Sequence, residues 1–478
     1  MSSSSTTVVP AEVIDLIVDE ISQIRDERTR NKALASVALV SWYCRHRAHA
    51  RLFSNLYITE TQRASGTLRI RSLLQLIEAD KESEISGVAS YIRSFSVHLV
   101  GPTSRIRASL DNGTLASILR RIFKTKDVGP RSLSLSFLPR GNLRNVFDWT
   151  TLNADFLSAF HDLCYNPSLT TLHLAHFVNL PRTLLHHSFI KNVRFSKVQL
   201  ANTDDEDEIP EEARGESILD DPDISALEEG QAVPLESIDT DHSLPLLFLI
   251  DMTPQQILHP KLAFSQLRCL TAHINSIEDF HKTRWILINA ASTLKKLDII
   301  LFTNDEMPET HWRVAFSQLA ELKTISVMQN STSYKHPGRT SIPQICSFME
   351  HFTLHPNLEE VKISMFLYSH RDLTARTPEE IFDGHDLSPL DQLFSHARFY
   401  TLKRLSVEFK FNLYLPRGNW DIQAFRAASR EHVGRSFALT SATHAALAIN
   451  FKFDIHAIRY DHEQTNSFSS PLLNTTPV

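Results

Sequence analysis

The chain has 478 residues, of which 42% are hydrophobic and 22% are charged, and its formal net charge is −6. This apolar content supports substantial cores, and a count of only 12 glycines argues against glycine-rich phosphate-binding loops and turn-dense all-β folds. Residues 201–242 carry sixteen acidic residues and one basic residue, and the positive charge elsewhere is dispersed rather than gathered in the stripe expected of a nucleic-acid-binding protein.

Cysteine usage and the lack of long apolar runs limit the cellular location. Cys44, Cys164, Cys269 and Cys346 are far apart and form no Cys-x-x-Cys pair, so we expect reduced, buried thiols rather than a disulfide framework or a zinc site. The start of the chain has neither a basic segment nor an apolar core, as a secretory signal would. No window approaches ~20 consecutive apolar residues, the length that crosses a bilayer. We therefore expect an intracellular protein, cytoplasmic or nuclear, with no membrane partner.

Residues 9–58 predict three short helices, preceded by a serine-rich stretch, residues 1–8, that we expect to be disordered. Pro10 is compatible with a first helical position, because its missing N–H would be unpaired there anyway. Apolar residues then recur at helical spacing in two successive segments. Ser41 is placed to cap a third helix that starts at Trp42. Three helices of this size bury little apolar surface alone, so they are typical of a docking module that a partner completes.

Three segments of this stretch have a family likeness: Val9-Pro10-Ala11-Glu12-Val13-Ile14, Leu39-Val40-Ser41-Trp42 and Arg51-Leu52-Phe53. The stretch resembles an F-box, the three-helix module that joins substrate receptors to cullin-based ubiquitin ligases through a small linker subunit, and it is most similar to the F-box-like proteins that are numerous in fungi. An ordinary N-terminal helical cap is the alternative interpretation, because motif matches need structural context. The sequence does not divide the implied docking residues between the interface and the module's own core. The residues that the resemblance places at or beneath the surface for the linker subunit are Pro10, Val13, Ile14, Ile17, Leu39, Val40, Trp42, Leu52 and Phe53.

After the three helices one pattern returns repeatedly: a helical stretch, a polar or proline-containing turn, and then Leu-x-x-Leu-x-Leu or a close variant. The second and third apolar residues alternate with polar ones, so they lie on one face of a short strand and point into a core. Strands are predicted in this way at Phe95/Val97/Leu99, Leu133/Leu135/Phe137, Leu169/Leu172/Leu174, Val193/Phe195/Val198, Leu267/Leu270/Ala272, Leu294/Leu297/Ile299, Leu322/Ile325/Val327, Leu358/Val361/Ile363 and Leu402/Leu405/Val407.

This array, residues 59–200 and 244–460, resembles the irregular leucine-rich repeats that often follow an F-box. The resemblance implies an α/β solenoid with parallel strands on a concave face and helices outside. A generic α/β domain that uses the same strand signals is the alternative. A concave face of mixed charge suits a protein or peptide partner better than a small molecule. The candidate target-binding residues on it are His173, Lys295, Lys296, Glu360, Lys362, Lys403 and Arg404.

An acidic insert, residues 201–243, separates the two parts of the array. It has no aromatic residue and a high negative charge, so it buries too little apolar area to offset its chain entropy. We expect this insert to be disordered, and the tail, residues 461–478, as well.

Two short motifs imitate catalytic or metal-binding signatures without the context that those signatures need. His370-Arg371-Asp372-Leu373 is similar to the kinase catalytic-loop motif, but it lacks the downstream asparagine and a correctly placed glycine-rich loop and strand lysine. His351 and His355 have the spacing of zinc ligands on a helix, but no glutamate follows the first and no third ligand is apparent. His355 fits better in a His-Pro-Asn turn. We therefore expect no catalytic residue, metal or cofactor.

Together these features predict a non-catalytic substrate-recognition subunit of an SCF-type cullin-RING ubiquitin ligase, which holds a target near the ligase and performs no chemistry itself. Its expected partners are the linker subunit and an unidentified target protein, without nucleic acid. The alternative is a leucine-rich-repeat interaction scaffold in which the N-terminal helices act only as a cap.

Overall fold

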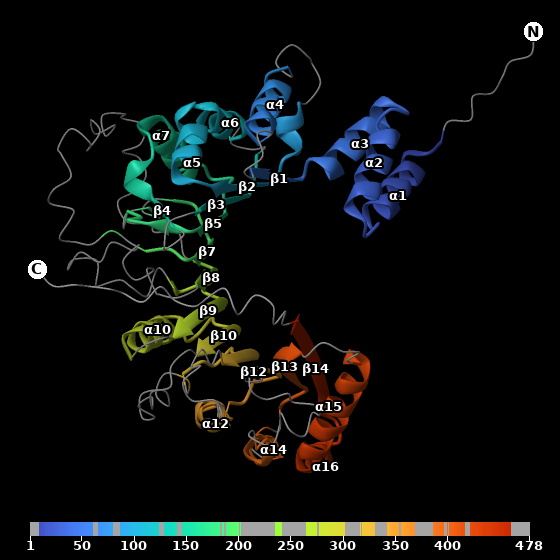
Figure 1. The fold of residues 1–478 in the computed structure, drawn as a ribbon, viewed down its shortest axis with the longest axis vertical. Helices are drawn as coiled ribbons and strands as arrows, with labels where there is room; N and C mark the ends of the chain where they lie inside the picture. The colour runs from blue at the N-terminus through green and yellow to red at the C-terminus, as the bar shows by residue number, and fades with distance from the viewer. Residues whose placement is uncertain are drawn as a thin grey trace, which may run out of the picture. The chain divides into compact units, whose positions relative to one another are not determined.

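The fold is described from a computed structural model of the chain (Figure 1). The chain divides into two compact units, Met1–Leu267 and Arg268–Val478. The residues that the structure describes are 9–60, 66–79, 87–123, 129–140, 146–181, 184–185, 188–199, 201, 235–240, 264–274, 277–301, 316, 318–329, 342–352, 355–368, 386–395, 399, 401–415 and 421–459.

Three helices open the first unit, and we call them the helical module: α1 (Ala11–Ser22), α2 (Glu27–Val37) and α3 (Trp42–Leu52). Side-chain caps fix where two of them start. Asp26 accepts a hydrogen bond from the backbone N–H of Thr29 at 2.7 Å, and Ser41 accepts one from that of Cys44 at 3.1 Å. The predicted cap at Ser41 is confirmed. Pro10 is the N-cap residue of α1, one position before the helical position predicted for it.

Six parallel strands follow in the first unit, and each pairs with the next one along the chain. In-register pairing places Ser94 beside Ser132 and Ser132 beside Thr171, so equivalent positions form rows across the strands. A separate parallel pair lies beside them, β4 (Phe147–Asp148) with β6 (Phe177–Val178). The strands are β1 (Asn55–Glu60), β2 (Ser94–Gly101), β3 (Ser132–Pro139), β5 (Thr171–Ala175), β7 (Asn192–Ser196) and β8 (Ser237–Thr240).

Helical segments connect β1 to β2, β2 to β3 and β3 to β5, as parallel neighbours require. α5 packs against β2 and β3, α4 packs against β1, and α6 packs against α4, α5 and α7. The connecting segments are α4 (Gly66–Ala79), η2 (Val88–Tyr91), α5 (Thr103–Asp111), α6 (Thr114–Ile122), η3 (Trp149–Thr151) and α7 (Ala154–Cys164).

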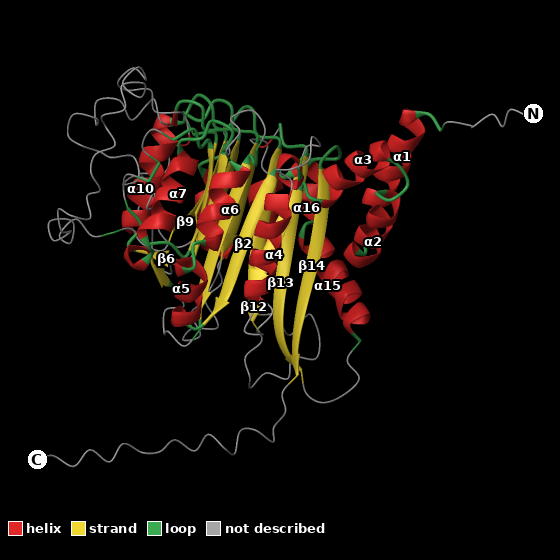
Figure 2. Cartoon of the chain, turned by 90° about the horizontal axis from the view of Figure 1, so that it is seen from above, coloured by secondary structure: helices red, strands yellow, loops and turns green. Residues whose placement is uncertain are grey.

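The second unit repeats this arrangement with six further parallel strands, again paired in chain order. Figure 2 shows the helices of the chain running alongside strands, and α10 packs against β9 and α15 against β14. The strands are β9 (Cys269–Ile274), β10 (Lys296–Leu301), β11 (Thr324–Gln329), β12 (Glu360–Tyr368), β13 (Arg404–Leu415) and β14 (Ala448–Arg459). The helices are α10 (Ile277–Asn289), α12 (Ile342–Glu350), α14 (Ser388–Ser395), α15 (Ile422–Ser436) and α16 (Ala438–Thr443).

Alternating side chains give the inner strands, such as β3 and β10, a buried apolar face and a polar face. In β3, Leu133, Leu135 and Phe137 are completely buried, whereas the serines between them are partly exposed. Leu297 and Ile299 are buried in the same way in β10. Because the period of the side chains is two, this pattern fixes which residues face the helices and which face away.

The mixed α/β class, with parallel strands after N-terminal helices, is confirmed, and so are the nine predicted strands. β1, β8, β14 and the short pair β4 and β6 are additional strands that were not predicted. In β7 the expected third apolar residue, Val198, lies after the strand, and the apolar residue that enters the strand is Ile190, which is 1% exposed.

β8 corrects the expected extent of the acidic insert. Residues 201–243 were expected to be disordered, but Ser237–Thr240 is a strand in which Ile238 pairs with Val193 of β7. Leu235 and Ile238 are both buried, so this short segment contributes apolar side chains to the core in spite of the acidic residues around them. Residues 202–234 and 241–243 of the insert, the N-terminal residues 1–8 and the tail 461–478 lie outside the described residues.

A buried aspartate joins two helices of the second unit. Asp391 of α14 accepts hydrogen bonds at Oδ1 from the backbone N–H and the hydroxyl of Thr440, at 2.8 and 2.7 Å. Its Oδ2 accepts a third from the backbone N–H of Leu439 at 3.1 Å. Leu439 and Thr440 both lie in the first turn of α16, whose own N-cap residue, Phe437, forms no side-chain cap. Asp391 therefore caps α16 from a different helix.

Replacing this carboxylate should destabilise the second unit. We expect Asp391→Ala to lower the free energy of unfolding by ~2–3 kcal/mol, because the donors of Leu439 and Thr440 lose a charged acceptor inside the protein. Urea denaturation followed by circular dichroism measures the change. The matched control is Glu431→Gln on the exposed side of α15, which should leave the unfolding curve unchanged. Identical curves for the wild type and Asp391→Ala would contradict this role.

Candidate functional site

Large exposed apolar side chains gather on the helical module. Leu16 and Ile17 of α1 are 65% and 47% exposed, and in the turn between α2 and α3 Leu39 and Val40 are 81% and 74% exposed. Contiguous apolar exposure on a protein surface usually marks an interaction site. We call the whole set the apolar surface: Val9, Val13, Leu16, Ile17, Leu39, Val40 and Trp42.

Helix α1 is apolar on two opposite faces. One face is covered, because Val18 is 1% exposed and is part of the small core of the module. Leu16, two residues earlier, points away from Val18 at 100° per residue, and Val13 and Ile17 lie within about 100° of it on one side. A helix of a globular protein normally buries its apolar residues, so this second apolar face is unusual. The buried members of the core are Val18, Leu34, Ala38, Cys44 and Ala48.

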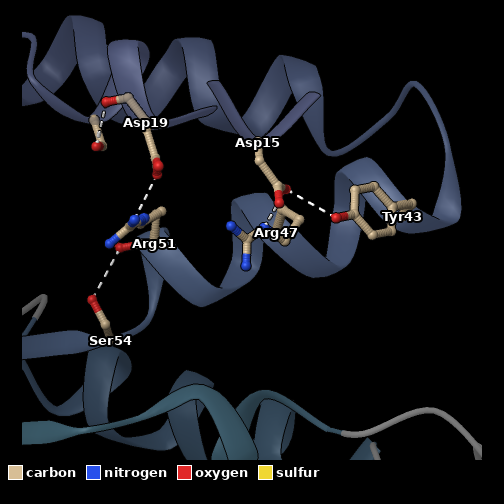
Figure 3. A network of polar contacts seen from close by, with 7 residues as sticks. Asp15, Asp19, Tyr43, Arg47, Arg51 and Ser54 are labelled. Carbon is tan, nitrogen blue, oxygen red and sulfur yellow. Dashed lines mark hydrogen bonds and ion pairs between the residues drawn. The ribbon is translucent and has the colours of Figure 1, made fainter. Parts of the chain in front are cut away.

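Polar contacts on a third side of α1 hold it against α3 (Figure 3). Asp15 accepts a hydrogen bond from the hydroxyl of Tyr43 at 3.0 Å and pairs with Arg47 at 2.6 Å. One turn later, Asp19 pairs with Arg51 at 2.5 Å. The hydrogen bond to Asp15 raises the pKa of the Tyr43 hydroxyl. Because the earlier aspartate meets the start of α3 and the later one meets its end, the two helices run in the same direction.

This direction places the start of the apolar surface on α1 at the end of the module that carries its second part, and Leu16 and Ile17 continue it to the middle of α1. The start of α1, with Val13, lies at the same end as the start of α3, with Trp42. The turn that carries Leu39 and Val40 immediately precedes α3, so it lies at that end too. The exposed apolar residues of both segments can therefore meet one partner.

The module is joined to the rest of the first unit through another part of α3. The ring of Tyr91 in η2 meets the rings of His46 and His49 edge to face, with centroid separations of 5.2 and 6.0 Å. The apolar surface does not supply this contact.

The structure divides the predicted docking residues into two groups. Pro10, Val13, Ile17, Leu39, Val40 and Trp42 are exposed. Ile14, Leu52 and Phe53 are half-buried, so they belong more to the body of the module than to its surface. Sequence reasoning missed Val9 and Leu16, although the spacing of Leu16 from Val13 and Ile17 places it on the same helical face.

The predicted target-binding residues of the second unit lie on the polar strand faces or directly before the strands. Lys296 pairs with Asp298 at 2.6 Å, and Lys403 pairs with Glu359 at 3.1 Å. Lys362 and Arg404 both reach Glu360, at 3.4 and 3.1 Å. The structure therefore brings these charges together as an ion-pair network, while Lys295 is exposed one residue before β10.

In the first unit, His173 lies on the polar face of β5. Its Nδ1 is 2.9 Å from the hydroxyl of Ser134 on β3, and its register partner on β7 is Arg194, which pairs with Asp239 of β8 at 3.1 Å. This face therefore combines small polar residues with an ion pair.

His355, which has the spacing of a zinc ligand from His351, has a structural role. His355 is buried, its Nε2 is hydrogen-bonded to the carbonyl of Leu319, and Asn357 donates to the carbonyl of Ala320 at 2.7 Å. Burial lowers the pKa of His355. The described part of the chain contains no group of three histidine, cysteine or acidic residues that could hold a metal. Residues 370–373 lie outside it.

Three of the four cysteines, Cys44, Cys164 and Cys346, are buried as expected, and Cys269 is half-buried. Burial raises the pKa of the Cys346 thiol to about 12 and raises that of Cys164 as well. Both thiols are therefore protonated at neutral pH and are poor nucleophiles.

No family model matches this chain, and no curated protein matches it significantly. Within the described residues, every helix is too short or too polar to traverse a lipid bilayer.

Two leucine-to-alanine substitutions separate the core of the module from its apolar surface. Leu34 is 1% exposed, so we expect Leu34→Ala to destabilise the module by ~2–4 kcal/mol. Leu16→Ala removes an exposed side chain and should change stability by less than ~0.5 kcal/mol. Hydrogen exchange of the α1–α3 amides measures both. Equal losses of protection would contradict the division of α1 into a covered and an uncovered face.

Proposed function

We propose that this chain is the substrate-recognition subunit of an SCF-type cullin-RING ubiquitin ligase, with the helical module acting as an F-box. The single observation that carries the proposal is the apolar surface at one end of the module. A face that exposes Leu16, Leu39 and Val40 to water is unfavourable in isolation, and burying it against another protein removes that cost.

The linker subunit of the ligase is the proposed occupant of the apolar surface. Trp42 is its largest side chain and is suited to act as an anchor, because aromatic residues dominate the energy of many interfaces. The ion pairs of Asp15 and Asp19 hold α1 and α3 in place before binding, so little ordering cost is incurred on docking.

The parallel strands that follow the module support the second half of the proposal, an array similar to irregular leucine-rich repeats that binds a target protein. Each strand pairs with its neighbour in the chain, as expected when repeats are stacked one after another. Charged side chains at and before the strands, such as Lys403 and Arg404, which are 69% and 66% exposed, are accessible for contact with a macromolecular partner. The chain would then act by proximity, holding a target where the other subunits of the ligase can modify it.

Charged substitutions on the apolar surface should abolish capture of the linker subunit. We expect Leu16→Asp combined with Val40→Asp to weaken binding by more than ~2 kcal/mol, because both side chains would be buried in the interface. Isothermal titration of the purified linker subunit into the full chain measures the affinity. Leu76→Asp, which alters an exposed leucine of α4, is the matched control and should bind normally. A wild-type chain that fails to bind the linker subunit would refute the proposal.

Removal of the module distinguishes a docking role from that of a helical cap. We expect a chain that lacks residues 1–53 to remain soluble and folded while it no longer binds the linker subunit. The truncation keeps Ser54, whose carbonyl accepts hydrogen bonds from the backbone N–H groups of Arg93 and Ser94, both at 2.8 Å. Size-exclusion chromatography and circular dichroism measure the outcome. Aggregation on removal of the module would instead favour the interaction scaffold, in which the helices only cover the first strands.

A further inference from the structure

The residues that directly precede the strands of the second unit form a row of their own. The backbone N–H of Lys295 donates to the carbonyl of Arg268 at 2.9 Å, and that of Lys323 donates to the carbonyl of Lys295 at 2.9 Å. Glu359 and Lys403 continue the series with bonds of 2.9 and 2.8 Å. We call these five residues the strand-entry row. Its charges run positive, positive, positive, negative, positive.

The first three cations of this row, Arg268, Lys295 and Lys323, are exposed and form no ion pair with any residue that the structure describes. Lys323 acts on the Glu359 carboxyl only through its charge, without a direct ion pair. The strands that follow the three cations are neighbours, about 4.8 Å apart. Like charges at adjacent positions of neighbouring strands repel one another. The three residues therefore weaken the fold slightly and are poised for an external anion.

The other basic residues of the row and of the adjoining strand face already have partners. Lys403 is bonded to Glu359, and this contact, with further help from Lys323 and Arg404, holds the pKa of the Glu359 carboxyl below its usual value. Lys296, one residue beyond Lys295, is paired with Asp298. Among the described residues of this row, the cations without an ion-pair partner are thus those at the entries of β9, β10 and β11.

The corresponding position in the first unit is less basic. Arg131 follows Arg93 there, but the next entry is Thr170, and Lys191 is paired with Glu236 at 3.1 Å. Arg93 also donates to the carbonyl of Ser90 at 2.9 Å. Three adjacent uncompensated cations are therefore a feature of the second unit among the described strand entries.

We infer that Arg268, Lys295 and Lys323 form a binding site for an extended acidic segment of a protein target. The distance from the first to the third of these entries is about 9.6 Å, close to the ~9.3 Å between residues three apart in an extended polyproline II segment. Residues three apart lie on one face of such a segment, so their carboxylates would reach both ends of the site. Nucleic acid fits less well, because the site spans only three strands and Glu359 closes it at one end.

This inference names the class of target for the proposed receptor and so rests on that function, but peptide binding by the full-length chain tests it without the linker subunit. The probe is a fluorescein-labelled peptide with glutamate at every third position, separated by glycine and serine. We expect saturable binding that weakens as salt is added. R268E/K295E/K323E should reduce the affinity at least tenfold, and R435E, a charge reversal on the exposed face of α15, should change it less than twofold.

Two comparisons make the result decisive. R268Q/K295Q/K323Q removes the charges without reversing them, and it should also lose at least tenfold, with an unchanged circular dichroism spectrum. The same peptide with glutamine in place of glutamate should not bind. Equal binding of the glutamine peptide, full affinity in the triple glutamine variant, or tighter binding of a single-stranded oligouridine RNA would each overturn the inference. If the chain bound the acidic peptide but failed to capture the linker subunit, the proposed function would fail and the inferred peptide site would still hold.

Discussion

In-register parallel pairing is the constraint on which the rest of the architecture depends. Each strand must meet its neighbour at the same repeat position, so a residue type placed at one offset is repeated across the sheet. Apolar residues at two offsets produce the buried face, as Leu405 and Val407 do in β13. The residue just before the strand is brought into the strand-entry row by the same backbone bonds. The same strand register therefore produces both the buried apolar core and the strand-entry row.

The helical module follows a different logic, because its own core is too small to use all its apolar residues. Val18 and Leu34 are buried within it, while Leu16 on the other side of α1 remains in water. Ion pairs from Asp15 and Asp19 fix the helices without covering this side. The module is thus internally ordered and externally incomplete, a combination that suits a preformed docking element.

Local sequence patterns predicted strands where all three apolar positions of the repeat were occupied, as by Leu322, Ile325 and Val327. They failed where one residue was replaced: the entry position occupied by Leu402 before β13 is Ala446 before β14. β8 was not predicted, because Leu235 and Ile238 lie among acidic residues. β1 fits the pattern from Phe53 onward but was assigned to the helices. The division of α1 into two faces, and the pairing of Glu359 and Glu360 with their cations, depend on tertiary packing and could not be obtained from spacing.

The contact made by Asp391 affects how the end of the second unit opens. In a sheet assembled from successive strands, a terminal strand can fray alone, because it loses contacts with one neighbour only. Here α16, which leads into β14, is held at its first turn by a carboxylate from α14, the helix before β13. Detaching the last strand with its helix therefore disrupts the preceding repeat as well, and the final two repeats melt as one cooperative block.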